Sequence, residues 1–121
     1  MSHPVVHWEI GARSAAASRE FYAKLFGWEI LGAGDAGYAQ VAPGEEGGMG
    51  GGIMQLPPGV PPYVTVYVRV DDLDAALKRA ESLGGKTVAP PMPIEGVAEV
   101  SGFAMFSDPD GNVIGLLKMA T

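Results

Sequence analysis

The internal repeat of this chain constrains its fold more than any other feature. VVHWEI precedes the helical stretch SAAASREFYAKLFG, and about 58 residues later VTVYVRV precedes DDLDAALKRAESLGG. Three short strand candidates follow each helix, which gives the order βαβββ twice. We therefore predict an α+β fold of two tandem modules, about 1–56 and 63–121, within one domain, 1–121. The proline-rich segment PPGVPP, 57–62, is the expected linker.

The ends of both helices are marked by capping residues. Ser14 is a good N-cap for the first helix, which we expect to end at Phe26 before Gly27. Asp71 or Asp72 caps the second helix. Apolar spacing predicts a buried stripe on each helix: Ala17, Phe21 and Leu25 with Tyr22 and Phe26 beside them, and then Leu73, Ala76, Leu77, Ala80 and Leu83.

Strand alternation separates two faces in the first strand of each module. Val6, Trp8 and Ile10 are expected beneath the helices, which leaves His7 and Glu9 on the opposite face. In YVTVYVRV the four valines form the helix-facing row, and the opposite row is Tyr63, Thr65, Tyr67 and Arg69. These polar groups either pair with one another, for example Glu9 with Arg69, or bind a ligand.

Two further segments bear on structure more than on chemistry. The glycine-rich stretch 47–52 is either a hairpin connection, a lid, or a backbone that approaches another group closely. SDPDGN at 107–112 has its proline and glycine where a tight turn needs them, so Asp108 and Asp110 are expected to form that turn.

Composition excludes several classes of partner. The net charge is −6, and the eight Lys and Arg residues are scattered singly, so we expect no nucleic-acid partner. The absence of Cys excludes disulfides, thiolate metal sites and cysteine nucleophiles. No apolar run reaches the roughly 18 residues of a membrane helix, and no signal peptide is evident, so we expect a cytoplasmic protein without a membrane partner.

The duplicated unit resembles the vicinal oxygen chelate superfamily, which includes glyoxalase I, bleomycin-resistance proteins, extradiol dioxygenases and methylmalonyl-CoA epimerases. The resemblance rests on H-x-E-I at 7–10, SREFYAKLFGW at 18–28, VDDLDAAL and LGG within 70–85, and SDPDGN at 107–112. It implies a cleft-shaped sheet of eight strands with the helices outside, and a homodimer.

The resemblance also implies where a metal would bind. Metal-dependent members hold a divalent ion with His, Glu or Asp from the first and last strands of each module. His7 matches the first position, but Thr65 and Gly115 occupy two others, and 47–56 contains no such residue. We therefore predict no cofactor, with a divalent metal at His7 and Glu9 as the alternative.

The candidate site residues follow from these positions. His7 and Glu9 are the predicted catalytic pair, acting as acid or base. The predicted ligand-binding residues are Met54, Gln55, Thr65, Tyr67 and Arg69. We predict a metal-independent pocket protein, a lyase or isomerase acting on a small metabolite. The alternatives are a dimer that sequesters an antibiotic or metabolite without chemistry, and a metal-dependent lyase or dioxygenase with an atypical ligand set.

Overall fold

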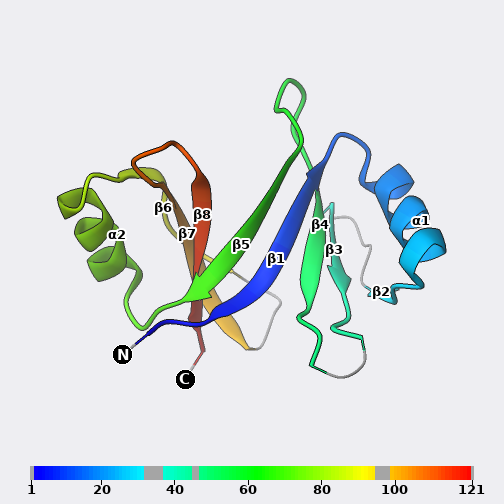
Figure 1. Cartoon of the computed structure of the whole chain (residues 1–121), viewed down its shortest axis with the longest axis horizontal. Helices are drawn as coiled ribbons and strands as arrows, with labels where there is room; N and C mark the ends of the chain where they lie inside the picture. Colours follow the sequence, from blue (N-terminus) through cyan, green and yellow to red (C-terminus); the bar gives the residue numbers. More distant parts are fainter. Residues whose placement is uncertain (1, 32–36, 45–46, 95–98, 121) are drawn as a thin grey trace. The chain divides into compact units, whose positions relative to one another are not determined.

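The computed structural model describes residues 2–31, 37–44, 47–94 and 99–120, and it has the predicted α+β order of elements (Figure 1). The first module comprises β1 (Val5–Ala12), α1 (Ala15–Phe26), β2 (Ile30–Leu31), β3 (Tyr38–Val41) and β4 (Gly51–Gln55). The second comprises β5 (Tyr63–Arg69), α2 (Leu73–Ser82), β6 (Lys86–Pro93), β7 (Val100–Ser107) and β8 (Val113–Met119). The repeat of βαβββ is thereby confirmed.

By contacts, the chain divides into two compact units, residues 7–65 and residues 1–6 with 66–121. We call them the N-terminal unit and the C-terminal unit. The first residues belong to the C-terminal unit because the backbone N–H of Arg69 donates to the carbonyl of Pro4 at 2.9 Å. The cleft expected between the two modules stays a prediction.

The strands of the N-terminal unit lie in the order β2-β3-β4-β1. β1 and β4 are parallel, with Glu9 opposite Gly52, whereas β3 and β4 are antiparallel, with Tyr38 opposite Met54. A core forms between this sheet and α1, and its members are Ala12, Ala15, Val41 and Ile53, with Trp8, Ile10, Tyr22, Trp28 and Ile30 packed against them. Trp8 and Ile10 therefore take the helix-facing side, as predicted.

The C-terminal unit repeats this arrangement with the order β5-β8-β7-β6. β5 and β8 are parallel, with Tyr67 opposite Gly115. Its core consists of Val70, Leu73, Leu77, Ala104 and Leu116, with Val68, Ala76 and Phe106 beside them. Burial of such aliphatic side chains contributes about 1.5–3 kcal/mol each to the stability of the fold. The predicted apolar face of α2 therefore holds this helix against the sheet.

Both helix caps were predicted correctly. The Ser14 hydroxyl accepts the N–H of Ala17 at 3.2 Å, and the Asp72 carboxylate accepts that of Ala75 at 3.0 Å. Gly27 closes α1 with φ of 70°. That left-handed conformation costs a glycine little.

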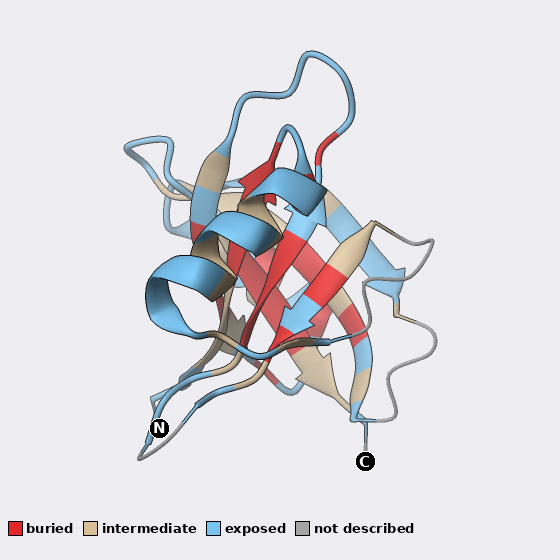
Figure 2. Ribbon diagram, turned by 90° about the vertical axis from the view of Figure 1, so that its right-hand side faces the viewer, coloured by how far each residue is buried: buried red, intermediate tan, exposed pale blue. Residues whose placement is uncertain are grey.

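The predicted buried stripe of α1 is wrong. Phe21 is 58% exposed and Leu25 is 57% exposed, while Ala15 is buried and Tyr22 is half-buried. Figure 2 shows this helix largely exposed above strands with buried segments. The physical reason is that Tyr22 stacks on Trp28, with ring centroids 5.1 Å apart, and this contact sets the rotation of the helix.

Two smaller expectations also failed. Leu83, expected on the buried face of α2, is exposed, because the helix ends at Ser82 and Leu83 lies at its C-cap. Val64, expected in the helix-facing row of β5, is 75% exposed. Apolar periodicity predicts which side chains share a face, but it does not say how far an element is covered along its length.

Local hydrogen bonds hold the 107–112 turn. The Asp108 carboxylate accepts the N–H groups of Asp110 and Asn112, both at 2.9 Å, which confirms Asp108 as a turn-former.

β6 contains Pro90, Pro91 and Pro93, which an edge strand with bulges tolerates. Among the described helices, none is long and apolar enough to span a membrane.

Candidate active site

The predicted pair His7 and Glu9 lies on one face of β1 in the N-terminal unit. Glu9 is only 3% exposed, and His7 is half-buried. Alternation along the strand places both side chains opposite the core residues Trp8 and Ile10. A carboxyl group with so little contact with water requires hydrogen-bond partners from the protein.

Two tyrosines supply those partners. The Tyr63 hydroxyl, from the start of β5, donates to Glu9 Oε2 at 2.7 Å. The Tyr38 hydroxyl, from β3, lies 2.7 Å from His7 Nε2. A second hydrogen bond joins Tyr38 to the Glu9 carboxylate. The site is therefore a chain of hydrogen bonds in the order His7, Tyr38, Glu9, Tyr63.

Two glycines make room for these tyrosine rings. A Cβ placed on Gly52 would overlap the hydroxyl and ring of Tyr38, and one placed on Gly11 would overlap the ring of Tyr63. Because position 52 has no side chain, the Tyr38 ring can cross β4 and reach His7 and Glu9 on β1. The glycines thus determine which hydroxyls can reach the carboxylate.

The electrostatics of the site keep both phenols protonated. Burial raises the pKa of Tyr38 far above its usual value, and the charge of Glu9 and the hydrogen bond to it act in the same direction. Burial, the hydrogen bond to Glu9 and its charge likewise raise the pKa of Tyr63. Each phenol therefore remains a hydrogen-bond donor throughout the physiological range.

His7 is kept neutral by its surroundings. Burial lowers its pKa from the usual value of 6.5, and the nearby Glu9 carboxylate opposes this shift only in part. If the Tyr38 proton is directed to Glu9, the Tyr38 oxygen accepts a hydrogen bond from a protonated His7 Nε2. The basic lone pair of the imidazole then lies on Nδ1.

The side chains of this site do not fit the ligand set of a divalent metal. Within the described ranges, no group of three or more His, Cys, Asp or Glu side chains could hold an ion. The space beside His7 and Glu9 that a third ligand from β4 would need holds the Tyr38 hydroxyl, over Gly52. We derive no step through a metal for this protein.

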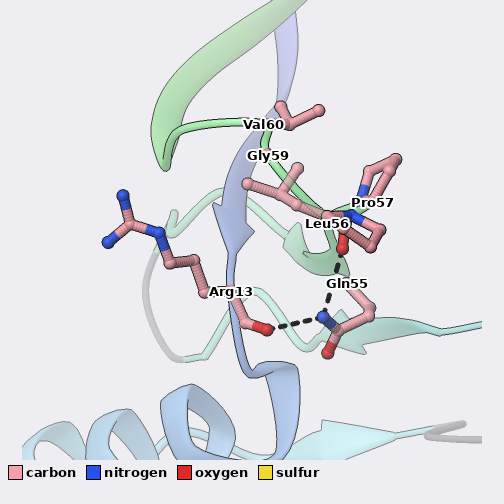
Figure 3. Close-up of a pocket in the computed structure, with 7 residues that line it drawn as sticks. Arg13, Gln55, Leu56, Pro57, Gly59 and Val60 are labelled. Carbon is pink, nitrogen blue, oxygen red and sulfur yellow. Dashed lines mark hydrogen bonds between the residues drawn. The ribbon is translucent and has the colours of Figure 1, made fainter.

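The structure gives the predicted ligand-binding residue Gln55 a structural task. Its Oε1 accepts the N–H of Ala15 at 2.9 Å. Its Nε2 donates to the carbonyls of Arg13 and Leu56 at 2.6 and 3.3 Å (Figure 3). These bonds fasten the start of α1 to the end of β4, beside an open pocket of about 460 Å³. Its amide is thus engaged with the backbone.

The other predicted ligand-binding residues are divided between the units. Met54 is in the N-terminal unit, where its sulfur lies 3.7 Å from the Tyr63 hydroxyl. Thr65 is buried in the same unit. Tyr67 is buried in the C-terminal unit, where its ring lies over Gly115, and Arg69 is exposed. The pairing of Glu9 with Arg69 stays a prediction.

A groove of about 620 Å³ adjoins the site within the N-terminal unit. It shares Tyr63 and Gly11 with the site, and its other lining residues include Ile10 on the helix-facing side of β1 and Ala17, Ser18 and Tyr22 on α1. His7, Glu9 and Tyr38 are not among the residues that line it. Volumes between about 300 and 1,000 Å³ are typical of small-molecule sites. The groove is open, and it gives a small ligand a place next to the Tyr63 ring.

Tyr38 is a site residue that the sequence does not reveal. It lies in one of the short strand candidates after the first helix, in GYAQV at 37–41, and nothing in that segment indicates that its side chain reaches β1. The signal that could have found it is Gly52: a glycine inside a strand often marks a close approach of another group. This confirms one reading of the glycine-rich stretch for Gly51 and Gly52, where the rings of Trp8 and Tyr38 pack.

Comparisons with known proteins agree with this architecture. The model of the family described as Glyoxalase/Bleomycin resistance protein/Dioxygenase superfamily matches residues 5–116. The anthracycline biosynthesis protein DnrV of Streptomyces peucetius is 31% identical over 122 residues, covering 86% of this chain and 42% of that protein. The glyoxylase-like protein CFP32 of Mycobacterium bovis is 44% identical over 71 residues, covering 58% of this chain and 26% of that protein.

Solved structures show the same fold at low sequence identity. The hypothetical protein BH1468 of Bacillus halodurans superimposes with a TM-score of 0.73 at 16% identity, covering 100% of this chain and 97% of that one. Methylmalonyl-CoA epimerase of Mycobacterium tuberculosis gives 0.64 at 22% identity, with 97% and 88% covered. The chain spans less than half the length of the curated relatives that it matches.

Proposed function

Because the chain belongs to the glyoxalase/bleomycin resistance protein/dioxygenase superfamily, we propose that it transfers protons on a small metabolite without a metal, as a lyase or an isomerase. The hydrogen-bonded chain of His7, Tyr38, Glu9 and Tyr63 carries this proposal. It combines a neutral imidazole with two protonated phenols around one buried carboxylate. Those are the parts that acid–base chemistry at a carbonyl compound requires.

The chemistry assigns a role to each group. Removal of a proton from a carbon next to a carbonyl needs a base, and the enolate oxygen formed needs a hydrogen-bond donor. His7 is the base, because its lowered pKa leaves it unprotonated at neutral pH. The Tyr63 hydroxyl, which donates to Glu9 Oε2 in the structure, turns its single proton to the substrate oxygen, and Tyr38 stays hydrogen-bonded to Glu9. Return of the proton to the neighbouring carbon gives an isomer, and departure of a leaving group gives a lyase product.

Proton exchange tests the proposal even while the natural substrate is unidentified. The protein is incubated in D₂O with a panel of 2-oxo acids, 1,2-dicarbonyl compounds and 2-hydroxyketones, and NMR follows deuterium incorporation next to the carbonyl. We expect catalysed exchange in at least one compound, reduced about 10²–10⁴-fold by His7→Gln, which is the usual contribution of a positioned base. His3→Gln is the matched control, since His3 is the other histidine of the chain, is exposed, and lies outside the hydrogen-bonded chain.

The outcome that would contradict the proposal is exchange that His7→Gln leaves unchanged, or the absence of exchange across the panel by protein that binds its members. The second result favours the other candidate, a protein that binds its ligand without chemistry. The groove beside Tyr63 and Tyr22 supports that candidate. Because DnrV is named for anthracycline biosynthesis, an anthracycline belongs in the ligand panel, with binding followed by calorimetry.

We also propose that the chain forms a homodimer. The exposed side chains of Phe21, Leu25 and Phe26 on α1 support this proposal, because adjacent apolar residues at 57–58% exposure suit a protein contact. Light scattering coupled to size exclusion tests it, with Phe21→Glu as the disrupting variant. Leu83→Glu is the control, since Leu83 is similarly exposed at the end of α2. A wild-type monomer at 100 μM, or a dimer unaffected by Phe21→Glu, would contradict this assignment.

A further inference from the structure

Tyr38 occupies the space that a metal ligand from β4 would need. The inference drawn from its position rests on the proposed metal-independent function. We propose that the Tyr38 hydroxyl takes the place of a metal ion in this site: it joins His7 to Glu9 as a shared ion would, and it excludes divalent cations from His7 Nε2 and the Glu9 carboxylate. Tyr38 was not a ligand or catalytic candidate from the sequence, and the proposal comes from its position over Gly52.

The Tyr38 side chain crosses β4 to reach β1. Tyr38 starts on β3, opposite Met54 of β4, and its hydroxyl ends on the far side of β4, 2.7 Å from His7 Nε2. The ring crosses β4 at Gly52, which pairs with Glu9. A carboxylate at position 52 and the Tyr38 ring cannot occupy this space together. Position 52 of β4 can therefore carry either a metal-binding side chain or a glycine over which the Tyr38 ring packs, and in this chain it is a glycine.

A cation bound here would need lone pairs of the imidazole and the carboxylate. A metal binds imidazole through an unprotonated nitrogen and binds carboxylate oxygens directly. Here His7 Nε2 and the Glu9 carboxylate both face the Tyr38 hydroxyl, and Glu9 Oε2 also accepts the hydroxyl of Tyr63. A cation bound to both side chains would have to displace these two half-buried phenols from Glu9, and each hydrogen bond lost costs about 0.5–1.5 kcal/mol.

The phenol that replaces the ion has its own role in the site. A phenol shared between an imidazole and a carboxylate orients both and can pass a proton between them. Like a metal ion, it is compatible with a neutral imidazole, but it adds no net positive charge to the site. Tyr38 is thus a positioning residue for His7, which is the base of the proposed function.

Imidazole nitrogen NMR tests the proposal without any measurement of activity. The chain has two histidines, so two sets of signals are expected, and His7→Gln assigns them. In the wild type, we expect His7 Nε2 to show the shift of a protonated nitrogen, and one equivalent of Zn²⁺ to leave the His7 signals in place. Tyr38→Phe should move these signals, while the matched control Tyr22→Phe should not.

Two results would overturn the inference. One is a stoichiometric shift of the wild-type His7 signals on addition of Zn²⁺, which would place the cation at the imidazole despite Tyr38. The other is a Tyr38→Phe spectrum with unchanged His7 signals, which would show that the phenol and the imidazole are not joined. Neither depends on turnover, so a failure of the exchange experiment leaves this test intact.

Discussion

Substitution of Gly52 by alanine would test whether the Tyr38 ring needs the passage across β4. The added methyl group would overlap the Oη, Cζ and Cε1 atoms of Tyr38, and the ring cannot retreat without giving up His7 and Glu9. Overpacking costs about 1–3 kcal/mol, and the loss of a buried phenol's hydrogen bonds costs about 1–3 kcal/mol. Because the protein can relieve one cost only by incurring the other, we expect Gly52→Ala to lower the free energy of unfolding by about 1–3 kcal/mol.

A double-mutant cycle with Tyr38→Ala isolates this contact. Once the ring is absent, the extra methyl group meets free space, so Gly52→Ala should cost less than about 1 kcal/mol in that background. Urea unfolding followed by fluorescence of Trp8 and Trp28 measures all four proteins. Gly50→Ala is the comparison within the same segment, because its added Cβ would lie 3.3 Å from the carbonyl oxygen of Val41, a tight contact without the overlap met at Gly52. Equal costs in the two backgrounds would refute the passage argument.

The remaining predictions concern protonation and packing. Because the pKa values of Tyr38 and Tyr63 are raised, the contribution of these tyrosines to stability is fully present below about pH 10 and is lost as the pH rises further. Absorbance at 295 nm should therefore show tyrosine ionisation at unusually high pH, and this late ionisation should disappear in the Tyr38→Phe, Tyr63→Phe double variant. Titration of all tyrosines at the ordinary pH in the folded protein would contradict this. Because the pKa of His7 is lowered, its contribution to stability is present above about pH 6.5 and is lost as the pH falls. The free energy of unfolding, measured in urea from about pH 7 to 4.5, should therefore depend less on pH in His7→Gln than in the wild type. An equal pH dependence in the two proteins would count against burial of the imidazole. In protein diluted until it is monomeric, Phe21→Ser should change the free energy of unfolding by no more than about 0.5 kcal/mol, because Phe21 is 58% exposed. A loss of about 3 kcal/mol in urea unfolding of that monomer would instead support the stripe expected from the sequence.

Much of the fold could be predicted because the sequence encodes it locally. Ser14, Gly27 and Asp72 mark helix ends through hydrogen bonds and backbone conformations that each residue determines almost alone. The rotation of α1 could not be predicted in this way, since several sets of positions satisfy helical spacing. The stacking of Tyr22 on Trp28 selects among them, and that contact depends on the segment that follows the helix.

In the site, too, local patterns could be predicted from the sequence and contacts between strands could not. His7 and Glu9 were identifiable because alternation along one strand places them on one face. Their partners Tyr38 and Tyr63 come from other strands, and reach Glu9 only through the absence of side chains at Gly52 and Gly11. Such long-range contacts depend on register, which short strands do not specify from sequence alone.

A crystal structure from crystals soaked in Zn²⁺, with anomalous data collected at the zinc edge, would test the central claim most directly. The account predicts the Tyr38 hydroxyl between His7 Nε2 and Glu9, at hydrogen-bond distance from both, with no anomalous peak bonded to either side chain. A zinc peak about 2.0–2.1 Å from His7 Nε2, with the Tyr38 ring displaced from Gly52, would contradict it.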